Sequence, residues 1–402
     1  MPLADRDQPR VCPFGPNERL DLHPTYQQLR HDQPLCRVRL PYGEPAWLLT
    51  RYADVRAALA DPDLSRAQAV VRDQPRMIPD IIPMGMMDMD APDHSRIRRL
   101  VSKAFTMRGA ERLRPYARRR AAELVKAMVD AGPPAELVRD FALPLTMSVI
   151  CELLGVRYED RSGFAQWVAE ATSAEGTAES RFEGLRKQMD YMAGLVAQCR
   201  REPTDDLLGA MVLARDEDDR LSEEELVLIS MGLLAAGFET TASEIANFAY
   251  LLLTLPDQLT VLRERPELLP DAIEELLRFA PLIAHPGIAR YATRDITLGG
   301  QVIPEGDAVL AFTPSANRDD TVFPDADRLD VTRPAGGHLT FGHGAHYCVG
   351  AQLARMELHV ALGELINGLP GLDLAVPIED VPWRTSVLIR GPEALSVTWP
   401  AG

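Results

Sequence analysis

The sequence contains few cysteines, and they form no recognisable metal-binding or disulfide pattern. The chain has 402 residues, and its five cysteines lie far apart, at Cys12, Cys36, Cys151, Cys199 and Cys348. No two of them form a Cys-x-x-Cys pair, which argues against a zinc ribbon or a thioredoxin-type site. Their low density excludes a small disulfide scaffold. Lysine is scarcer still, with three residues, so arginine supplies nearly all of the basic side chains.

Positive charge is also in deficit. The chain has 43 Lys and Arg against 59 Asp and Glu, which gives a formal net charge of −16. This balance argues against a protein that binds duplex nucleic acid. A composition of 46% hydrophobic and 25% charged residues is that of a soluble globular protein. The first ten residues lack the apolar core of a signal peptide or membrane anchor, so we expect a cytoplasmic protein.

One apolar run, residues 226–253, approaches the length of a membrane span. It contains Glu239 and Glu244, and each acid would cost at least about 2 kcal/mol in hydrocarbon. We therefore predict a long helix buried in a large soluble domain. Ser222 is a candidate N-cap and Pro256 a candidate terminator, so the helix would be about 50 Å long.

Helical periodicity dominates the remaining sequence, and strand patterns are few and short. Further helices are predicted over 94–105, 115–131, 141–154, 180–201, 205–215, 267–279 and 351–367. A β-hairpin is predicted from 36–40 and 46–49, and a small later sheet from 296–298, 301–303 and 308–310. The pattern indicates one large, mainly α domain over residues 1–402, with minor β sheets and a long central helix.

The most informative stretch is the glycine-punctuated loop from Phe341 to Gly350, which reads FGHGAHYCVG. Its glycines permit tight turns and close approach of the backbone to a flat partner. The loop delivers Cys348 to the start of a helix, where the N-terminal amides stabilise a thiolate. An isolated cysteine usually has a structural role. A chance match to the whole pattern, however, is on the order of one in a million.

A second motif, residues 236–241, places the acid of Glu239 next to the hydroxyl of Thr240 inside the central apolar helix. A threonine hydroxyl can bond to the carbonyl four residues earlier and bend or open the helix, which leaves a groove for a small molecule and a water. The plain alternative is a satisfied buried threonine beside a paired glutamate.

Together, these two motifs resemble those of the heme-thiolate monooxygenases, the cytochromes P-450. The resemblance runs from about residue 35 to the C-terminus and is closest to soluble actinobacterial members that tailor antibiotics. It implies the family fold, a single mainly α triangular prism that holds heme b between the central helix and the helix after the cysteine. It also implies that Cys348 binds the iron within a loop that includes Phe341 and Gly350. By the same resemblance, Thr240 would steady dioxygen and Glu239 would relay protons.

The pair Glu275 and Arg278 carries little information by itself, since an exposed pair at this spacing is worth only about 0.3–0.5 kcal/mol. Its place between the central helix and the cysteine loop resembles the structural Glu-x-x-Arg pair of the family. In relatives a downstream arginine completes this cluster. Arg328 is the expected third member, and Arg333 is the alternative.

Heme propionates need cationic partners, and an arginine fork suits a carboxylate well. The resemblance implies that His94, Arg98, Arg290 and His346 serve this purpose. Any one of them alone could be a solvated surface charge. The resemblance also implies a mostly apolar substrate pocket that includes the methionine-rich loop 70–90. Its other expected lining residues are Leu233, Leu234, Ala236, Ile283, His285, Val387 and Leu388.

Residues 96–120 contain ten basic side chains and one acid, against the trend of the chain. Such a run is usually a solvated helical face, but it could also dock an acidic electron carrier. The sequence shows no fused reductase or flavin domain. We therefore expect electrons from a separate ferredoxin and its NAD(P)H-dependent reductase, with the basic region 96–120 as the candidate docking surface.

The resemblance implies insertion of one oxygen atom from O2, by hydroxylation or epoxidation, into a bulky and largely apolar molecule. A secondary metabolite such as a macrolide or another antibiotic intermediate is the preferred substrate class. Two alternatives remain open. One is catabolic oxidation of a terpene, fatty acid or xenobiotic, and the other is a heme-thiolate sensor or binding protein without turnover. Intact Glu239 and Thr240 weigh against the sensor.

Overall fold

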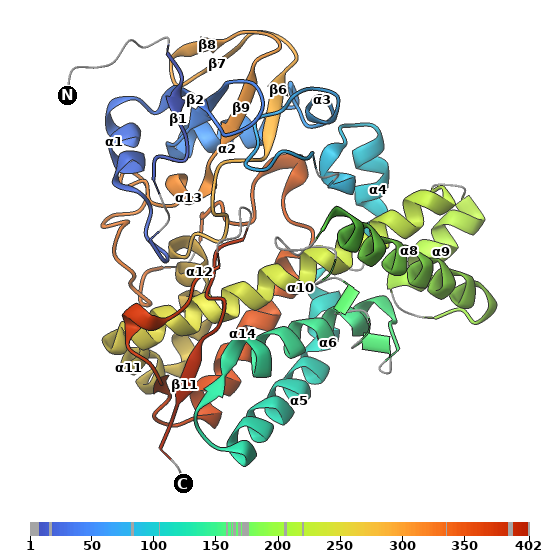
Figure 1. Ribbon diagram of the computed structural model, residues 1–402, viewed down its shortest axis with the longest axis vertical. Helices are drawn as coiled ribbons and strands as arrows, with labels where there is room; N and C mark the ends of the chain where they lie inside the picture. The colour runs from blue at the N-terminus through green and yellow to red at the C-terminus, as the bar shows by residue number, and fades with distance from the viewer. Residues whose placement is uncertain are drawn as a thin grey trace. The chain divides into compact units, whose positions relative to one another are not determined.

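The computed structural model describes most of the chain, namely residues 8–15, 18–81, 84–103, 105–157, 160–161, 163, 166–167, 170, 177–204, 207–218, 221–334, 336–384 and 389–400. Its contacts divide the chain into two compact units, each assembled from separate stretches (Figure 1). The first unit comprises Met1–Asp90, Leu255–Cys348 and Trp383–Pro392. The second comprises Ala91–Thr254, Val349–Pro382 and Glu393–Gly402. That the two units make up one domain stays a prediction.

The first unit is organised around a six-stranded sheet with the order β1-β2-β3-β9-β6-β4. Its strands are β1 (Arg10–Val11), β2 (Leu35–Arg39), β3 (Ala46–Leu49), β4 (Leu64–Ser65), β6 (Ala289–Ala292) and β9 (Ala308–Ala311). The predicted hairpin is confirmed, because β2 and β3 pair antiparallel. The predicted later sheet is only half right. β7 (Ile296–Leu298) and β8 (Gln301–Ile303) form a separate hairpin, whereas β9 pairs in parallel with β3.

Burial explains why β9 belongs to the main sheet. Ala308, Val309 and Leu310 are all fully buried, as expected of a strand that is covered on both faces. In β8, by contrast, Gln301 and Val302 are exposed, which suits a hairpin at the edge of the molecule. A three-residue apolar run does not reveal in advance which of these environments it will occupy.

Alternating side chains divide the core of the first unit into two apolar clusters, one on each face of the sheet. In β3, Ala46 and Leu48 join the cluster that contains Tyr26 and Leu29 of α1 (Pro24–Asp32). Leu49 joins the opposite cluster, with residues of α2 (Tyr52–Ala60). The first unit also contains α3 (Ala67–Val70), α11 (Pro256–Glu264), α12 (Leu269–Phe279) and α13 (Thr313–Ala316).

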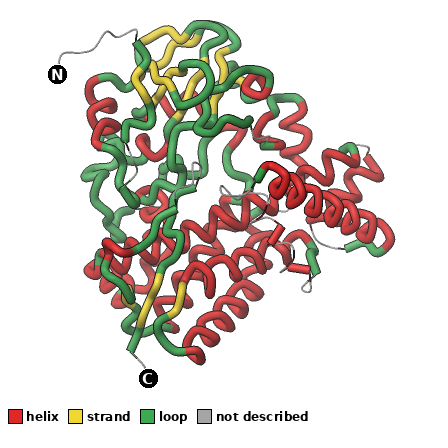
Figure 2. The backbone as a smooth tube through the Cα atoms, viewed as in Figure 1, coloured by secondary structure: helices red, strands yellow, loops and turns green. Residues whose placement is uncertain are grey.

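The second unit is mostly helical, as the tube drawing shows (Figure 2). Its helices are α4 (Asp93–Ser102), α5 (Met107–Ala131), α6 (Leu143–Leu154), α8 (Ala178–Arg201), α9 (Leu207–Asp218), α10 (Glu223–Thr254) and α14 (Ala351–Gly368). Every helix predicted for this unit is present, although α5 begins eight residues early. Thr106 caps it by accepting from the amide of Gly109 at 3.1 Å, and Pro115 is accommodated within the helix. A three-stranded sheet in the order β10-β11-β5 completes the unit, and its strands are β5 (Ala135–Glu136), β10 (Asp373–Leu374) and β11 (Ser396–Thr398).

The central helix α10 packs against α6, α8 and α14 within the second unit. Its predicted cap is confirmed as a capping box. Ser222 Oγ accepts from the amide of Glu225 at 3.0 Å, and the Glu225 carboxylate accepts from the amide of Ser222 at 2.7 Å. By length and composition alone, Glu225–Thr254 could cross a membrane, a property that core helices of soluble proteins share. Within it, Glu244 and Asn247 are buried in the protein, which fits the predicted core helix.

Candidate functional site

The candidate site is built around the loop that precedes α14. The loop closes on itself, because the amide of Cys348 donates to the carbonyl oxygen of Phe341 at 2.8 Å. A turn of 3-10 helix, η5 (Gly344–His346), lies between these two residues. Gly342 and Gly344 have φ angles of +74° and +72°, which other residues rarely adopt. The predicted tight turns are therefore present.

Gly344 is needed for space as well as for its backbone conformation. A Cβ atom at this position would lie 2.6 Å from the carbonyl oxygen of Leu59 and 2.8 Å from Cα of Ala60. Both are backbone atoms at the C-terminal end of α2, so they cannot move aside as a flexible side chain would. The cysteine loop is therefore seated directly on this helix end.

The thiol of Cys348 is exposed, whereas the other four cysteines are buried. Burial raises the pKa of Cys12 and Cys151 to about 12 and that of Cys36 to about 11. Such thiols stay protonated at neutral pH and are poor metal ligands. Cys348 is thus the cysteine that combines an accessible sulfur with a preformed loop, as the sequence predicts.

Hydrogen bonds to α12 fix the segment that leads into this loop. Thr340 Oγ1 donates to the carbonyl oxygen of Leu277 at 2.6 Å and accepts from Asn317 Nδ2 at 2.9 Å. Nearby, Nε2 of His338 lies 3.1 Å from the carboxylate of Glu274, which also belongs to α12. The sequence analysis did not identify Asn317, His338 or Glu274, because none of them stands in a motif that the sequence alone makes visible.

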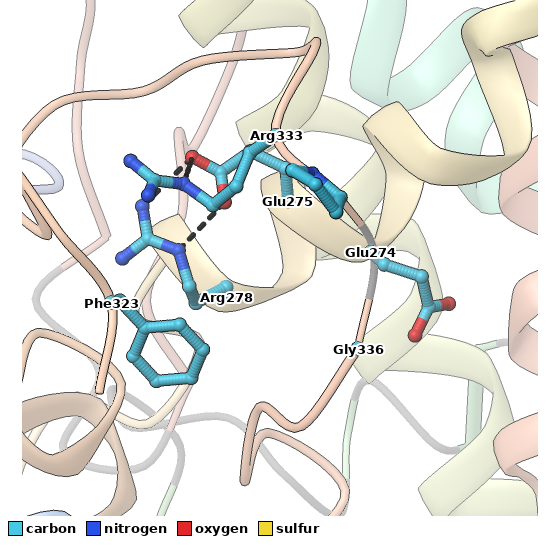
Figure 3. Close-up of a pocket in the computed structure, with 7 residues that line it drawn as sticks. Glu274, Glu275, Arg278, Phe323, Arg333 and Gly336 are labelled. Atoms are coloured by element: carbon cyan, nitrogen blue, oxygen red, sulfur yellow. Dashed lines mark hydrogen bonds and ion pairs between the residues drawn. The ribbon is translucent and has the colours of Figure 1, made fainter.

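The Glu-x-x-Arg pair is buried and is completed by a second arginine (Figure 3). Arg278 Nε and Nη2 donate to the two carboxylate oxygens of Glu275 at 2.6 and 2.8 Å. Arg333 Nε donates to the same carboxylate at 3.1 Å, and Figure 3 shows both guanidinium groups directed at it. Both side chains of the Glu275–Arg278 pair are at most 2% exposed. Such a fully hydrogen-bonded bidentate pair differs entirely from an exposed ion pair.

The expectation that Arg328 completes this cluster is wrong, and the alternative, Arg333, is right. Arg328 is exposed and contributes its carbonyl oxygen, which accepts from Arg278 Nη2 at 3.3 Å. The cause lies in the local backbone. Asp325 has a φ of +52°, and the turn after it buries Ala326 and Leu329 while Arg328 faces solvent.

The acid and threonine motif lies in the interior of α10. Thr240 Oγ1 donates to the carbonyl oxygen of Ala236 at 2.5 Å, which is the bond to the fourth preceding residue that the sequence predicts. Glu239 and Thr240 are both partly exposed, whereas Phe238 is buried. A Cβ atom on Gly237 would lie 2.9 Å from Cδ1 of Ile150 in α6, so glycine permits close packing of the two helices here. The helix itself continues without interruption from Glu223 to Thr254.

Arg290 is buried in β6, with Nη1 donating to the carbonyl oxygen of Leu64 at 3.3 Å. Burial, with the like charge of Arg66 as a smaller cause, lowers the pKa of Arg290 to about 10. No ion pair among the described residues includes Arg290. His346 lies half-buried in η5. The hydrogen bonds that Asp90 accepts outweigh its burial and lower the pKa of Asp90, and the charge of His346 lowers it further.

His94 and Arg98 lie one turn apart in α4, and His94 is buried while Arg98 is half-buried. These two residues, with Glu239 and Thr240, belong to the second unit. The first unit holds Arg290, His346 and Cys348. The assignment of all four cationic residues to heme propionates stays a prediction.

The residues around the cysteine loop fit a heme group. A buried guanidinium is costly unless an anion or several acceptors surround it. Arg290 has one described carbonyl acceptor and no described carboxylate partner, which suits a propionate. The exposed sulfur of Cys348 supplies a soft ligand of the kind that iron in heme-thiolate proteins uses.

The expected pocket residues have different environments. Leu233 and Leu234 are buried in α10, and Ala236 is exposed. Ile283 and His285 are half-buried, and burial together with the charge of Arg390 lowers the pKa of His285. Val387 and Leu388 lie outside the described residues. The assignment of these residues to a substrate pocket stays a prediction.

The basic region 96–120 covers most of α4 and the first half of α5. Four of its arginines form ion pairs: Arg96 with Glu225, Arg114 with Glu111, Arg118 with Glu364 and Arg120 with Glu123. Five further cations are exposed: Arg99, Lys103, Arg108, Arg112 and Arg119. Within the part of the chain that the structure describes, no ion pair includes any of these five. They are exposed positive charges without a described ion pair on an acidic protein.

Comparison with known proteins identifies close relatives over the whole chain. The family model described as Cytochrome P450 matches residues 166–369. The mycinamicin IV hydroxylase/epoxidase of Micromonospora griseorubida is 50% identical over 393 residues, which covers 98% of this chain and 99% of the relative. The nocardicin C N-oxygenase of Nocardia uniformis subsp. tsuyamanensis is 48% identical over 401 residues, covering 98% of this chain and 100% of the relative.

Solved structures give the same result for the fold. The mixed-function P450 MycG, whose structure has been solved, is 49% identical to this chain. The two superimpose with a TM-score of 0.93, over 98% of this chain and 100% of the other. A fold of mainly helical units with small sheets and a long central helix is therefore shared with this protein.

Proposed function

Because the chain belongs to the cytochrome P450 family and is thus a heme-iron monooxygenase, we propose that Cys348 is the axial ligand of a heme b. Two observations support the assignment. The sulfur of Cys348 is exposed, whereas the other cysteines are buried. The loop that carries it is closed by the bond between Cys348 N and Phe341 O, and it is anchored on α2 at Gly344. The closed loop with an exposed cysteine sulfur is the observation that carries the proposal.

The chain's own contribution begins with binding and orientation. Bound heme supplies the chemistry that inserts one atom of O2 into a C–H or C=C bond. Arg290 and His346, together with His94 and Arg98, would bind its propionates as charge-assisted hydrogen-bond donors. The buried position of Arg290 makes its interaction with a carboxylate strong, because few waters compete for the guanidinium.

Proton supply is the proposed task of Glu239 and Thr240. The bond from Thr240 Oγ1 to Ala236 O fixes the rotamer of the threonine and leaves its oxygen able to accept a further hydrogen bond. Glu239 is partly exposed, so water can approach the residue. Glu239 would take up protons from solvent, and Thr240 Oγ1 would pass them on into the site. This is general acid catalysis by positioned side chains.

The substrate is proposed to be a bulky, largely apolar secondary metabolite, such as a macrolide or another antibiotic intermediate, that is hydroxylated or epoxidised. The names of the relatives support this class. One is a hydroxylase and epoxidase of mycinamicin IV, and another is an N-oxygenase of nocardicin C. The methionines exposed at 84 and 87 suit a large apolar ligand, because methionine adapts to irregular shapes.

A ferredoxin with its NAD(P)H-dependent reductase is the proposed electron source, and the protein is proposed to act in the cytoplasm. The five uncompensated cations of the basic region form the proposed docking surface. An acidic carrier would be steered to such a patch, and the complementary charges would fix its orientation.

Carbon monoxide binding to the reduced protein tests the ligand assignment. The purified protein should take up heme and show the long-wavelength carbon-monoxide band of a thiolate-ligated heme. Cys348→Ser should abolish this band, because a hydroxyl does not replace a thiolate as an electron donor to iron. Cys199→Ser, at a buried cysteine, should leave it unchanged. Persistence of the band in Cys348→Ser would overturn the assignment.

Substrate class and turnover need a separate measurement. A panel of macrolides, terpenes and fatty acids should be screened for a shift in the spin state of the heme spectrum, and each hit tested for NADPH consumption with a surrogate ferredoxin. Macrolide-like hits with product formation support the proposal. Terpene or fatty-acid hits alone favour catabolism, and binding without NADPH consumption favours a sensor.

A further inference from the structure

Arg66 is a buried cation of the first unit with a hydrogen bond from each guanidinium nitrogen, and neither the motifs nor the proposed function use it. Its side chain is 3% exposed. It follows β4 directly, and its three guanidinium nitrogens each reach a different partner. Nε donates to the carbonyl oxygen of Met87 at 2.9 Å, Nη2 donates to Asp88 Oδ1 at 3.0 Å, and Nη1 donates to the carbonyl oxygen of Ala289.

These partners belong to two separate stretches of chain. Met87 and Asp88 lie in the segment 84–90, which includes the short helix η1 (Gly85–Asp88). Ala289 begins β6, one residue before Arg290. Arg66 therefore ties the backbone of the segment to the strand that carries Arg290.

The carboxylates of the segment reinforce this tie. Asp88 accepts from Arg66 with one oxygen and from the amide of Met84 at 2.5 Å with the other. Asp90 accepts from the amide of Arg66 at 2.9 Å and from Ser65 Oγ at 2.5 Å. Both ends of the segment are thus held by hydrogen bonds that converge on Arg66 or its neighbour.

The side chains of the segment behave differently from its backbone. Met84 and Met87 are each 37% exposed, although the backbone beside them is fixed by a buried arginine. A segment with a determined backbone and unpacked apolar side chains is suited to contact a ligand. The occupant that fits is the apolar part of the small-molecule substrate, since methionine adapts to irregular shapes.

We propose that Arg66 is a positioning residue for substrate specificity, which sets the placement of the methionine segment 84–90 relative to β6 and Arg290. This inference rests on the proposed function, because the segment matters only if a substrate binds beside it. Lysine cannot replace Arg66, since an ammonium lacks the planar fork that reaches three acceptors at once. Arg290 is also held against β4, because its Nη1 donates to the carbonyl oxygen of Leu64, two residues before Arg66.

The chain offers a matched control in Arg72, six residues further on. Its Nη1 donates to the carbonyl oxygen of Gly306, and its guanidinium stacks on the ring of Tyr291 at 4.8 Å. Arg72 thus also connects its own loop to the six-stranded sheet of the first unit, but it makes no described contact with residues 84–90. Arg72→Lys removes a comparable arginine from the same stretch of chain and leaves the Arg66 contacts intact.

The test compares Arg66→Lys, Asp88→Ala and Arg72→Lys in the heme-loaded full chain. The first measurement is hydrogen–deuterium exchange of the peptide that covers 84–90. The second is spectral titration with two iron-binding probes, imidazole and the bulky azole clotrimazole. Loss of charged hydrogen bonds predicts exchange about tenfold faster and clotrimazole binding about tenfold weaker in Arg66→Lys. Imidazole lacks the bulky apolar groups that would contact the segment, so it should bind within about twofold of the wild type.

The outcomes separate this inference from the proposed function. Arg72→Lys should match the wild type in the exchange of 84–90, and an equal acceleration of that exchange in Arg72→Lys would overturn the role of Arg66. Unchanged exchange and an unchanged clotrimazole-to-imidazole ratio in Arg66→Lys would also overturn it. If Arg66→Lys takes up no heme, Asp88→Ala decides by the same two criteria. A wild-type protein that binds no imidazole would instead contradict the heme assignment itself.

Discussion

At the scale of single residues, chemistry depends on which side chains the fold leaves accessible. Cys348 is exposed while the four other cysteines are buried, three of them with raised pKa values. Glu239 and Thr240 are likewise partly exposed, although Phe238 and Ala242 beside them are buried. Reactive groups are therefore accessible at the positions where the two motifs occur.

Thr240→Ala removes the hydroxyl that is held on Ala236 O. Heme content and substrate binding should stay the same, because the hydroxyl is not needed for either. The share of NADPH electrons that ends in product should fall by about tenfold or more, and hydrogen peroxide should rise to match, since proton delivery is lost. Oxygen uptake, peroxide and product measured together check this balance. Thr240→Ser, which keeps the hydroxyl, should restore coupling, and full coupling in Thr240→Ala would remove Thr240 from the mechanism.

Single residues also show where sequence reasoning succeeds and where it fails. The bond from Thr240 to Ala236 and the turns at Gly342 and Gly344 were predictable, because they depend on neighbours within a few positions. The choice between Arg328 and Arg333 was not, because it depends on a turn with positive φ at Asp325 that no motif announces. No sequence pattern pointed to Arg66, since the backbone carbonyls that it binds lie 21 and 223 residues away in the sequence.

At the scale of elements, the cysteine loop depends on the end of α2. Gly344→Ala should lower heme retention, because its Cβ would meet Leu59 O at 2.6 Å and the φ of +72° would also be strained. The strain of the left-handed conformation alone is about 1–2 kcal/mol. Gly300→Ala is a matched control, with a φ of +76° and no atom within 4 Å of the added Cβ. The heme-to-protein absorbance ratio of the purified variants checks this prediction, which fails if both variants retain heme equally.

Helix α10 carries a buried acid that the proposed mechanism does not use. Glu244 is 3% exposed, and burial raises its pKa to about 8 despite the hydrogen bond from Asn247 Nδ2 at 3.2 Å. Glu244 Oε1 has no hydrogen-bond partner among the described residues. Burial likewise raises the pKa of Glu357 in α14 well above its usual range. Burial therefore favours the protonated form of both carboxyls in the folded protein.

This burial gives stability a pH dependence of definite sign. Between about pH 4.5 and 8, Glu244 is ionised in the unfolded chain but protonated in the folded one, so the folded state binds one proton more and the free energy of unfolding falls as pH rises. Glu244→Gln removes this loss. The variant should gain on the order of 3 kcal/mol at pH 7 and almost nothing near pH 4.5. Denaturant titrations at both pH values check the difference, with Glu202→Gln as an exposed control. An equal effect of Glu244→Gln at both pH values would contradict it.

Elements differ in how far their sequence specifies them. The long helices were predictable because their apolar periodicity extends over many turns. The start of α5 was not, because Pro115 is typical of a helix start and yet lies inside the helix. The partner of β9 was also beyond prediction, since three apolar residues fit an edge hairpin and a central parallel strand equally well.

At the scale of the whole molecule, charge is distributed unevenly. The chain is acidic overall, yet Arg99, Lys103, Arg108, Arg112 and Arg119 form an exposed basic patch without described ion pairs. Composition alone revealed the run of cations. The structure was needed to separate these five from the four arginines whose charge is compensated by neighbouring acids.

The double variant Arg108→Glu/Arg112→Glu should impair electron delivery and leave the heme site intact. Ferredoxin-supported turnover at low salt should fall by about tenfold, mainly through a higher KM for ferredoxin, and the difference should shrink at high salt as charges are screened. Steady-state kinetics at two ionic strengths check this. The double variant Arg263→Glu/Arg265→Glu, at the end of α11, is a control of equal charge change. A loss of the same size in both proteins would assign the effect to net charge and contradict local docking.

The division of the chain into two discontinuous units has a consequence for biosynthesis. The first unit needs residues up to Pro392 and the second needs residues up to the last stretch, Glu393–Gly402. Neither unit can therefore finish folding before its last stretch has been synthesised, unlike a domain made of one continuous stretch near the N-terminus. Neither unit can be expressed as a simple truncation of the chain. A stop codon before residue 392 should therefore give an incompletely folded chain that is degraded by proteases.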